Sequence, residues 1–396
     1  MKKKHKKPVK DRRLKIMWNS NAPFSTSGYG QQMAIILPLL RDEGWIQAQV
    51  CFYGLEGGII DWNGIPLYPK MGDAWGSDAL VNHGKDFKCD ISITQQDVWP
   101  IDPNALSQFK NWIPYLPVDH DPIPEAVFNR IKSAYRVIAY SKYAKAQLAK
   151  KGIHSTYIPL MVDTDVFRPF DRATIRKEIG IPEDIFLFGM VAANKDNPPR
   201  KSFQEVLDAF KLFHDKHPKS GIYFNTNTVQ PEGFPIDEYA KSLGLENNVY
   251  RPPLYELFYK IDQKKMAMIY GAFDCLLAPS TNEGFGVPII EAQACGVPVI
   301  TNNFTSMPEL IVEGETGYLC EIASKRYTPL RAYIGVPSVQ SIYDNMEKIF
   351  VADRVKMGKK AREKAKEYDA KKVVKEMWNP YLERVQAEIY KSVDNK

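Results

Sequence analysis

Residues 274–301 read DCLLAPSTNEGFGVPIIEAQACGVPVIT, and this stretch decides the fold of the second half of the chain. The apolar runs 274–278 and 297–301 each predict a buried strand. Between them, Pro288 suits the first position of a helix, and Gly296 suits the position just past its end. A strand, a helix and a second strand in this order form the repeating unit of a parallel α/β sheet.

The turn before this helix is suited to binding an anion. Gly284 and Gly286 let the backbone turn tightly and approach a ligand closely. Ligands of open α/β sheets lie beyond the carboxyl ends of the strands, where this turn must be. The amides of Phe285, Gly286 and Val287 are free at the helix start and lie at the positive end of the helix dipole. We expect a diphosphate here.

Two carboxylates flank the turn. Glu283 precedes the helix, and Glu291 lies about one turn inside it, beside the expected phosphate. A carboxylate at position 291 can accept hydrogen bonds from a ribose diol, each worth about 1.5 to 3 kcal/mol. An isolated Glu would more simply stabilise the helix dipole. The glycine turn and the preceding strand favour a nucleotide-sugar site, with Glu283 nearer the reacting end.

The sequence around these carboxylates continues as AQACGVPVI (292–300), Pro308-Glu309 and EGETG (313–317). This series resembles the retaining glycosyltransferases of the GT-B fold, family four, also called glycosyl transferases group 1. Weaker similarity covers most of the chain, including YIPLMVDTDVFRP (157–169), which is similar to the end of that family's first domain. The resemblance implies two doubly wound α/β Rossmann-like domains facing a central cleft, with a C-terminal helix that crosses back to the first domain.

The rest of the chain agrees with two such domains. Its 396 residues suit two or three domains, and predicted strands and helices alternate along it. We expect a disordered basic arm (1–13), an acceptor-side domain (14–168), a nucleotide-sugar-binding domain (169–370) and a returning helix (371–396). The predicted strands are 14–18, 47–52, 90–94, 112–118, 136–140, 157–159, 186–191 and 222–225, and the predicted helices are 31–42, 125–133, 142–151, 203–216, 353–368 and 373–390.

The net charge of +6 is concentrated at the start of the chain. Residues 1–15 contain nine Lys or Arg and one Asp, so the remainder is nearly neutral. Such an arm can serve solubility, attraction to an anionic membrane or nucleic-acid contact. The arm has no aromatic residues interleaved with its basic ones, so no specific nucleic acid is expected.

Location is predicted from the cysteines and from apolar runs. Five cysteines without CxxC spacing are typical of reduced core residues in an intracellular protein. No apolar run follows the arm, and none approaches the roughly 18 residues of a membrane span. We expect a cytoplasmic protein, and the arm leaves open peripheral contact with the inner face of an anionic membrane.

Three further loops are candidates for the site. Gly28, Tyr29 and Gly30 open a helix after the first strand, so their backbone could approach phosphate or acceptor. A plain helix start would look the same, but the loop matches the N-terminal glycine loop of the family and so favours the functional interpretation.

The second loop, ANKDNPPRKS (193–202), follows the strand predicted at 186–191. Members of the family usually have an arginine just after this strand and a lysine several residues later, both bonded to the donor diphosphate. Lys201 matches the lysine, and Asn194 stands at the usual arginine position, so both are candidates to bind the donor. Arg200 is a candidate to replace that arginine. Two cations would neutralise a leaving diphosphate as its charge develops.

The third loop, PVDHDPIP (117–124), crowds three ionisable groups between prolines. Many relatives have a histidine here that contacts the transferred sugar, which makes His120 a candidate, although others carry glycine. Asp119 or Asp121 is the alternative group to orient an acceptor hydroxyl, and a purely structural histidine also fits the pattern. Asp-His-Asp also suggests a metal, but nothing else supports one. We expect no metal and no cofactor.

Taken with the resemblance, these residues predict a retaining transferase that moves a sugar from a nucleoside-diphosphate sugar to a hydroxyl of a glycan, lipid or protein. Glu283, His120, Asp119 and Asp121 are the candidate catalytic residues. Two alternatives stay open: a sugar-nucleotide epimerase or phosphorylase of the same architecture, and a catalytically silent protein that binds a nucleotide sugar or nucleic acid. The sequence identifies neither the base nor the sugar nor the acceptor.

Overall fold

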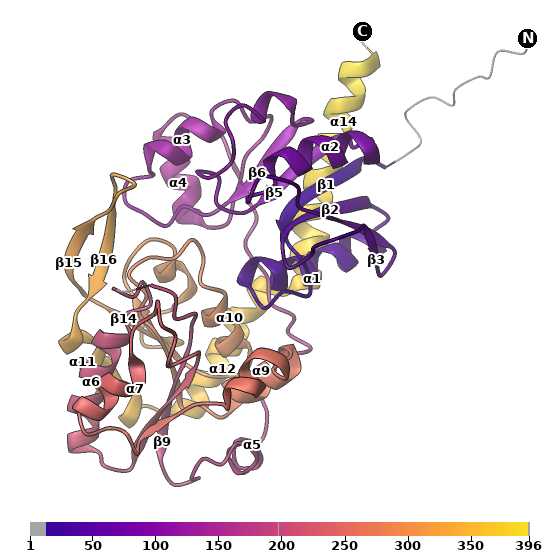
Figure 1. Ribbon diagram of the computed structural model, residues 1–396. Helices are drawn as coiled ribbons and strands as arrows, with labels where there is room; N and C mark the ends of the chain where they lie inside the picture. The colour runs from indigo at the N-terminus through magenta and orange to yellow at the C-terminus, as the bar shows by residue number, and fades with distance from the viewer. Residues whose placement is uncertain (1–12, 197, 395–396) are drawn as a thin grey trace, which may run out of the picture.

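The computed structural model describes residues 13–196 and 198–394. Its two parallel sheets lie in two domains, one above the other in Figure 1. The division predicted at residue 168 falls between the last strand of the first sheet, β8 (Thr156–Tyr157), and the first strand of the second, β9 (Phe186–Val191). The predicted basic arm, 1–13, lies outside the described residues except for Arg13.

In the described part of the chain, eight strands form the first sheet in the order β3-β4-β2-β1-β5-β6-β7-β8. All neighbours are parallel except β3 and β4, an antiparallel hairpin at the edge. Each predicted strand of this domain is present, within a few residues at its ends. The bounds are β1 (Lys15–Asn21), β2 (Ile46–Tyr53), β3 (Ile60–Trp62), β4 (Ile65–Pro69), β5 (Ile91–Gln95), β6 (Trp112–Leu116) and β7 (Ile138–Ala139).

The helices of this domain cover a sheet that is buried on both faces. The helix predicted from residue 31 begins at Gly28, because the Ser27 hydroxyl caps it and accepts from the Gly30 amide at 3.1 Å. The hairpin β3–β4 and helix α2 were not predicted. The helices are α1 (Gly28–Asp42), α2 (Ser77–Phe87), α3 (Glu125–Ile131) and α4 (Lys142–Lys150).

Six strands of the described residues form the second sheet, in the order β11-β10-β9-β12-β13-β14, all parallel. The strand-helix-strand unit predicted over 274–301 is confirmed as β12 (Cys275–Ala278), α10 (Val287–Ala294) and β13 (Val299–Asn302). The remaining elements are β10 (Ser220–Asn225), β11 (Val249–Tyr250), β14 (Gly317–Cys320), α5 (Arg172–Glu178), α6 (Phe203–Lys216), α7 (Ile236–Ser242), α8 (Leu254–Tyr259), α9 (Gln263–Gly271), α11 (Val339–Val351) and α12 (Arg354–Ala365).

A two-stranded hairpin stands apart from both sheets. Strands β15 (Ile322–Tyr327) and β16 (Tyr333–Pro337) are antiparallel and reach from the C-terminal domain to the N-terminal domain at the left of Figure 1. The sequence did not predict this hairpin, because most of its residues are exposed and carry no apolar alternation.

The last helix crosses back to the first domain, as predicted. A short helix α13 (Ala370–Val373) and a π-helical turn (Val374–Trp378) lead into α14 (Asn379–Asp394), which lies among the N-terminal elements in Figure 1. The buried Trp378 ring lies 5.5 Å from Trp18 and 5.1 Å from Tyr115, edge to face. The predicted fold class is therefore confirmed. No helix within residues 13–196 and 198–394 has the length and apolarity needed to cross a bilayer.

Candidate active site

The turn between β12 and α10 lies at the carboxyl end of the second sheet. Gly286 has φ of 109°, in the left-handed region that favours glycine, and it directly precedes the helix. The Phe285 side chain is buried edge-on against Tyr368, with ring centroids 5.6 Å apart. Phe285 can therefore offer a ligand only its backbone, while Val287 and Pro288 begin the helix behind it.

A small pocket opens beside this turn. It lies between the ends of β9 and β12 and the start of α10, and its lining includes Lys201, Ser280, Glu283, Gly286, Pro288 and Ile289. The helix start and a lysine thus face one space, which is suited to an anion.

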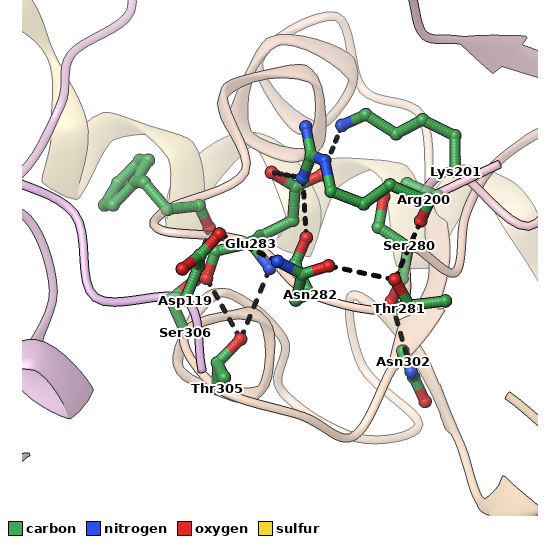
Figure 2. A network of polar contacts seen from close by, with 12 residues as sticks. Asp119, Arg200, Lys201, Ser280, Thr281, Asn282, Glu283, Asn302, Thr305 and Ser306 are labelled. Atoms are coloured by element: carbon green, nitrogen blue, oxygen red, sulfur yellow. Dashed lines mark hydrogen bonds and ion pairs between the residues drawn. The ribbon is translucent and has the colours of Figure 1, made fainter. Parts of the chain in front are cut away.

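Glu283 holds both predicted cations (Figure 2). Its Oε2 lies 3.2 Å from Arg200 Nη1, and its Oε1 pairs with Lys201 Nζ. Burial opposes the ionisation of Glu283, but the charges of Lys201 and Arg200 outweigh it and lower the pKa to about 2. The carboxylate is therefore ionised at neutral pH and pairs with both cations.

Short polar side chains fix the backbone of this loop (Figure 2). The Ser306 hydroxyl donates to the carbonyls of Glu283 and Phe285 at 2.8 and 3.0 Å, and the Thr305 hydroxyl donates to the carbonyl of Glu283 at 3.0 Å. Sequence reasoning missed both residues, although they lie only three and four residues after the end of β13.

Glu291 is 8% exposed, and it accepts a hydrogen bond from the Tyr270 hydroxyl on Oε2 at 2.7 Å. Burial raises its pKa to about 7, although the Tyr270 bond acts in the opposite direction. The carboxylate is thus poised between its two protonation states near neutral pH. Nothing in the sequence pointed to Tyr270, which precedes Glu291 by 21 residues at the end of α9.

The predicted first-domain loop meets this site directly. Asn282 Nδ2 donates to Asp119 Oδ2 at 2.7 Å, which joins the two domains. At Gly284 a Cβ atom would lie 2.2 Å from the Cβ of Pro117, so only glycine allows this approach. The two strand-end loops that sequence reasoning singled out therefore touch.

The three ionisable residues of that loop take different positions. His120 is buried, and its Nδ1 lies 2.6 Å from Asp119 Oδ1. Burial opposes the ionisation of Asp119, but the hydrogen bond and charge of His120, with Arg200, lower its pKa. Asp121 turns to the hairpin instead, where its carboxylate lies 3.0 Å from Lys325 Nζ. Asp119 and His120 thus lie together at the site, and Asp121 lies at its outer side.

The predicted glycine loop adds one side chain to this group. Gly28, Tyr29 and Gly30 form the first residues of α1, and the Tyr29 hydroxyl donates to Asp97 Oδ2 at 3.1 Å. Burial, followed by the charge of Asp119, raises the pKa of Asp97 to about 6. Sequence reasoning missed Asp97, although it follows β5 by two residues and the strand-end rule would have found it.

The interpretation of Asn194 as a donor-binding residue needs correction. Its side chain is 4% exposed, accepts from the Phe234 amide at 2.8 Å and donates to the carbonyls of Phe234 and Asn227 at 2.8 and 3.1 Å. An amide used in this way braces the loop 227–234. The donor-binding role was expected from the position of Asn194 after β9, but that position does not determine the direction in which its short side chain points.

Comparison with solved structures identifies the fold. A sucrose-phosphate synthase from Thermosynechococcus elongatus superimposes with a TM-score of 0.76 at 17% identity, over 95% of this chain and 100% of that one. The Anabaena protein HepE, in complex with UDP and glucose, gives 0.69 at 17% identity, over 93% and 99%. This likeness shows the fold, which is GT-B.

The C-terminal domain resembles a known family. Residues 171–326 match the model of glycosyl transferases group 1. A D-inositol 3-phosphate glycosyltransferase from Streptomyces avermitilis is 32% identical over 171 residues, which cover 40% of this chain and 34% of that protein. The chain thus spans about a third of the length of the curated relatives it matches. The C-terminal domain therefore matches the predicted family, glycosyl transferases group 1, over residues 171–326.

Proposed function

We propose that the protein transfers a sugar from a nucleoside-diphosphate sugar to an acceptor hydroxyl, with retention of anomeric configuration and without a metal. One observation carries the proposal: Gly286 at the start of α10, Lys201 and Glu283 line one pocket, and Arg200 pairs with Glu283 beside it. A helix start and one cation at the pocket, with a second cation paired to Glu283 beside it, suit a diphosphate.

The donor would bind mainly to the C-terminal domain. The amides of 285–287 would take diphosphate oxygens, and Arg200 and Lys201 would exchange part of their contact with Glu283 for phosphate. Glu291 would accept from the ribose diol with the oxygen that Tyr270 leaves available. Glu283, still ionised, would then be available to the hydroxyls of the sugar.

The chemical step follows from this placement. The bond between the anomeric carbon and the diphosphate oxygen breaks, and the acceptor oxygen bonds to that carbon on the same face. The acceptor proton passes to the departing phosphate oxygen. Arg200 and Lys201 would stabilise the charge that develops on the diphosphate, while Asp119 and His120 would contact the sugar from the other domain. Contact between the two loops excludes water, which otherwise competes as an acceptor.

Release of nucleoside diphosphate tests this function. The full chain is incubated with UDP-, GDP- and ADP-sugars, with and without acceptors. UDP-glucose and inositol phosphate belong in the first panel, because HepE is complexed with UDP and glucose and the matched relatives act as inositol 3-phosphate glycosyltransferases. Acceptor-dependent release, with a product of unchanged anomeric configuration by NMR, is the expected result.

Two other outcomes would identify the alternatives. Conversion of the donor without any acceptor would indicate an epimerase. Donor binding in calorimetry with no turnover under any condition would indicate a silent binding protein. No binding of any nucleotide sugar would overturn the donor site itself.

A cytoplasmic location, with the basic arm touching an anionic membrane, is the second part of the proposal. Five free cysteines among the described residues support a reducing compartment. Cosedimentation with phosphatidylglycerol vesicles, with and without residues 1–13, tests the arm. Binding that needs the arm and falls with salt is expected, and equal binding of both chains would contradict it.

A further inference from the structure

The hairpin β15–β16 is the strongest feature that the donor site does not use. The family match ends at residue 326, so Tyr327, the turn and all of β16 lie outside it. Part of the hairpin therefore lies beyond the matched stretch, beside the loops of the site, and is suited to a property particular to this chain.

The hairpin is fixed to both domains. On the C-terminal side, the Gly335 amide donates to the Thr281 carbonyl at 2.9 Å, and Asn302 Nδ2 donates to the Gly335 carbonyl at 2.8 Å. On the N-terminal side, Asp121 and Tyr333 exchange two main-chain hydrogen bonds of 3.0 and 2.8 Å. Strand β16 is therefore held between the two loops that carry Glu283 and Asp119.

This pairing places Tyr327 and Tyr333 together on one face of the hairpin, and we call these two residues the Tyr327–Tyr333 corner. Tyr327 pairs with Tyr333, and Tyr333 pairs with Asp121, so the three side chains form one row across the strands. The two rings are 5.1 Å apart with 61° between their planes, and Tyr327 and Tyr333 remain 58% and 41% exposed. Lys325, next along the same face, lies 3.0 Å from the Asp121 carboxylate.

The charges around the corner decide what kind of ligand suits it. Lys325 is paired with Asp121, and Arg326, on the opposite face, interacts with Glu205. A polyanion such as nucleic acid needs several free cations along its backbone, and this row does not provide them. Two exposed rings bordered by a carboxylate and an ammonium suit a sugar ring, whose apolar face stacks on an aromatic ring while its hydroxyls form hydrogen bonds.

We propose that the Tyr327–Tyr333 corner is an outer subsite for a carbohydrate acceptor of at least two sugar units. The inference rests on the proposed function. Asp121 follows Asp119 by two residues, a span of at most about 7 Å, comparable to one sugar unit. The unit that carries the recipient hydroxyl would lie at Asp119 and His120, and the next unit would lie against the two tyrosines.

The test compares disaccharides with the matching methyl monosaccharides as acceptors for the full chain. Maltose, cellobiose, chitobiose, lactose and mannobiose are the probes, read by release of nucleoside diphosphate from the donor found active. Tyr327→Ala and Tyr333→Ala should each raise the KM for the active disaccharide about tenfold, which is about 1.4 kcal/mol. The Kd for the nucleotide should stay within about twofold, because the donor site is separate.

Three further variants serve as controls for the stacking role of the two tyrosines. Tyr327→Phe and Tyr333→Phe should keep the low KM, since stacking needs the ring. Tyr259→Ala, at a tyrosine 75% exposed on α8, should behave as wild type. Equal unfolding temperatures of all variants establish that the hairpin change is local.

Several results would overturn the subsite. An unchanged disaccharide KM in both alanine variants, with normal donor binding, would do so and leave the transferase function standing. So would nucleotide-sugar binding without any disaccharide binding in saturation-transfer NMR. Salt-dependent binding of a 20-nucleotide single strand that is lost in the alanine variants would assign the corner to nucleic acid instead. Failure of every nucleotide sugar to bind would remove the proposed function, and the subsite with it.

Discussion

The proposed donor side and the proposed acceptor side of this site are built in different ways. The donor side comes from one contiguous unit, β12–α10, with Arg200 and Lys201 added from the loop after β9. The acceptor side is assembled from the start of α1, the ends of β5 and β6, and a hairpin from the other domain. A contiguous unit fixes its geometry locally, whereas an assembled surface changes whenever one loop changes.

The largest expected effect is on the donor side. Arg200→Ala removes one of two cations beside the pocket, so charge on the departing diphosphate is less well stabilised. We expect kcat to fall about 100- to 1,000-fold, with a smaller rise in KM. Steady-state kinetics with the active donor measures this, and Arg168→Ala, at an arginine outside the pocket, is the matched control. Kinetics equal to wild type would return the phosphate role to other residues.

Glu291→Ala tests the nucleotide end of the same unit. Two charged hydrogen bonds to the ribose are lost, so donor binding should weaken by about 2 to 4 kcal/mol. Calorimetry with the nucleoside diphosphate gives the number directly. Unchanged affinity would exclude the ribose assignment, and a similar loss in Tyr270→Phe would show that the supporting hydroxyl matters too.

Asn194→Ala separates a structural residue from a binding one. Loss of the buried bonds to Phe234 and Asn227 should lower the free energy of unfolding by about 1 to 3 kcal/mol, measured by urea denaturation. Donor affinity of the folded variant should be that of wild type. A variant of normal stability with weak donor binding would restore the interpretation drawn from the sequence.

The protonation of Glu291 gives a pH dependence to donor binding. Its pKa is about 7 in the folded chain, and only the ionised form accepts from both ribose hydroxyls. Donor affinity should therefore rise about tenfold from pH 6 to pH 8 and level off above, as measured by calorimetry. Glu291→Gln should remove this component of the pH dependence.

The raised pKa of Glu291 also makes folding stability depend on pH, and stability falls where donor affinity rises. Between the unfolded value near 4.5 and about 7, the folded state binds more protons at Glu291 than the unfolded state does. Its contribution to stability is therefore lost as pH rises through this window. Glu291→Gln should unfold at a higher temperature than wild type at pH 8, and a lower temperature would contradict the burial argument.

The smallest expected effect is on the acceptor side. Asp97→Asn keeps the contact with Tyr29 but removes a carboxylate, so the acceptor KM should rise about 3- to 10-fold while the nucleotide Kd stays constant. Acceptor titrations at saturating donor measure the first, and calorimetry measures the second. If nucleotide affinity falls as much as acceptor affinity, Asp97 affects both the donor and the acceptor parts of the site.

The same contrast explains what the sequence could predict. The β12–α10 unit was predicted closely because its strand, turn, helix and glycine signals are consecutive. Tyr270 was missed because no pattern near it marks its bond to Glu291. Asp97 was missed although it follows the end of β5, where the strand-end rule applies. The hairpin was missed because its strands are held by main-chain bonds to two loops rather than by an apolar face.

The returning helix has a consequence for how this chain is made. Trp378 completes an aromatic cluster with Trp18 and Tyr115, so the first domain to leave the ribosome lacks a central part of its own core. That domain cannot finish packing during synthesis until the donor domain has also emerged. The first domain therefore completes its core only after the returning helix has been made.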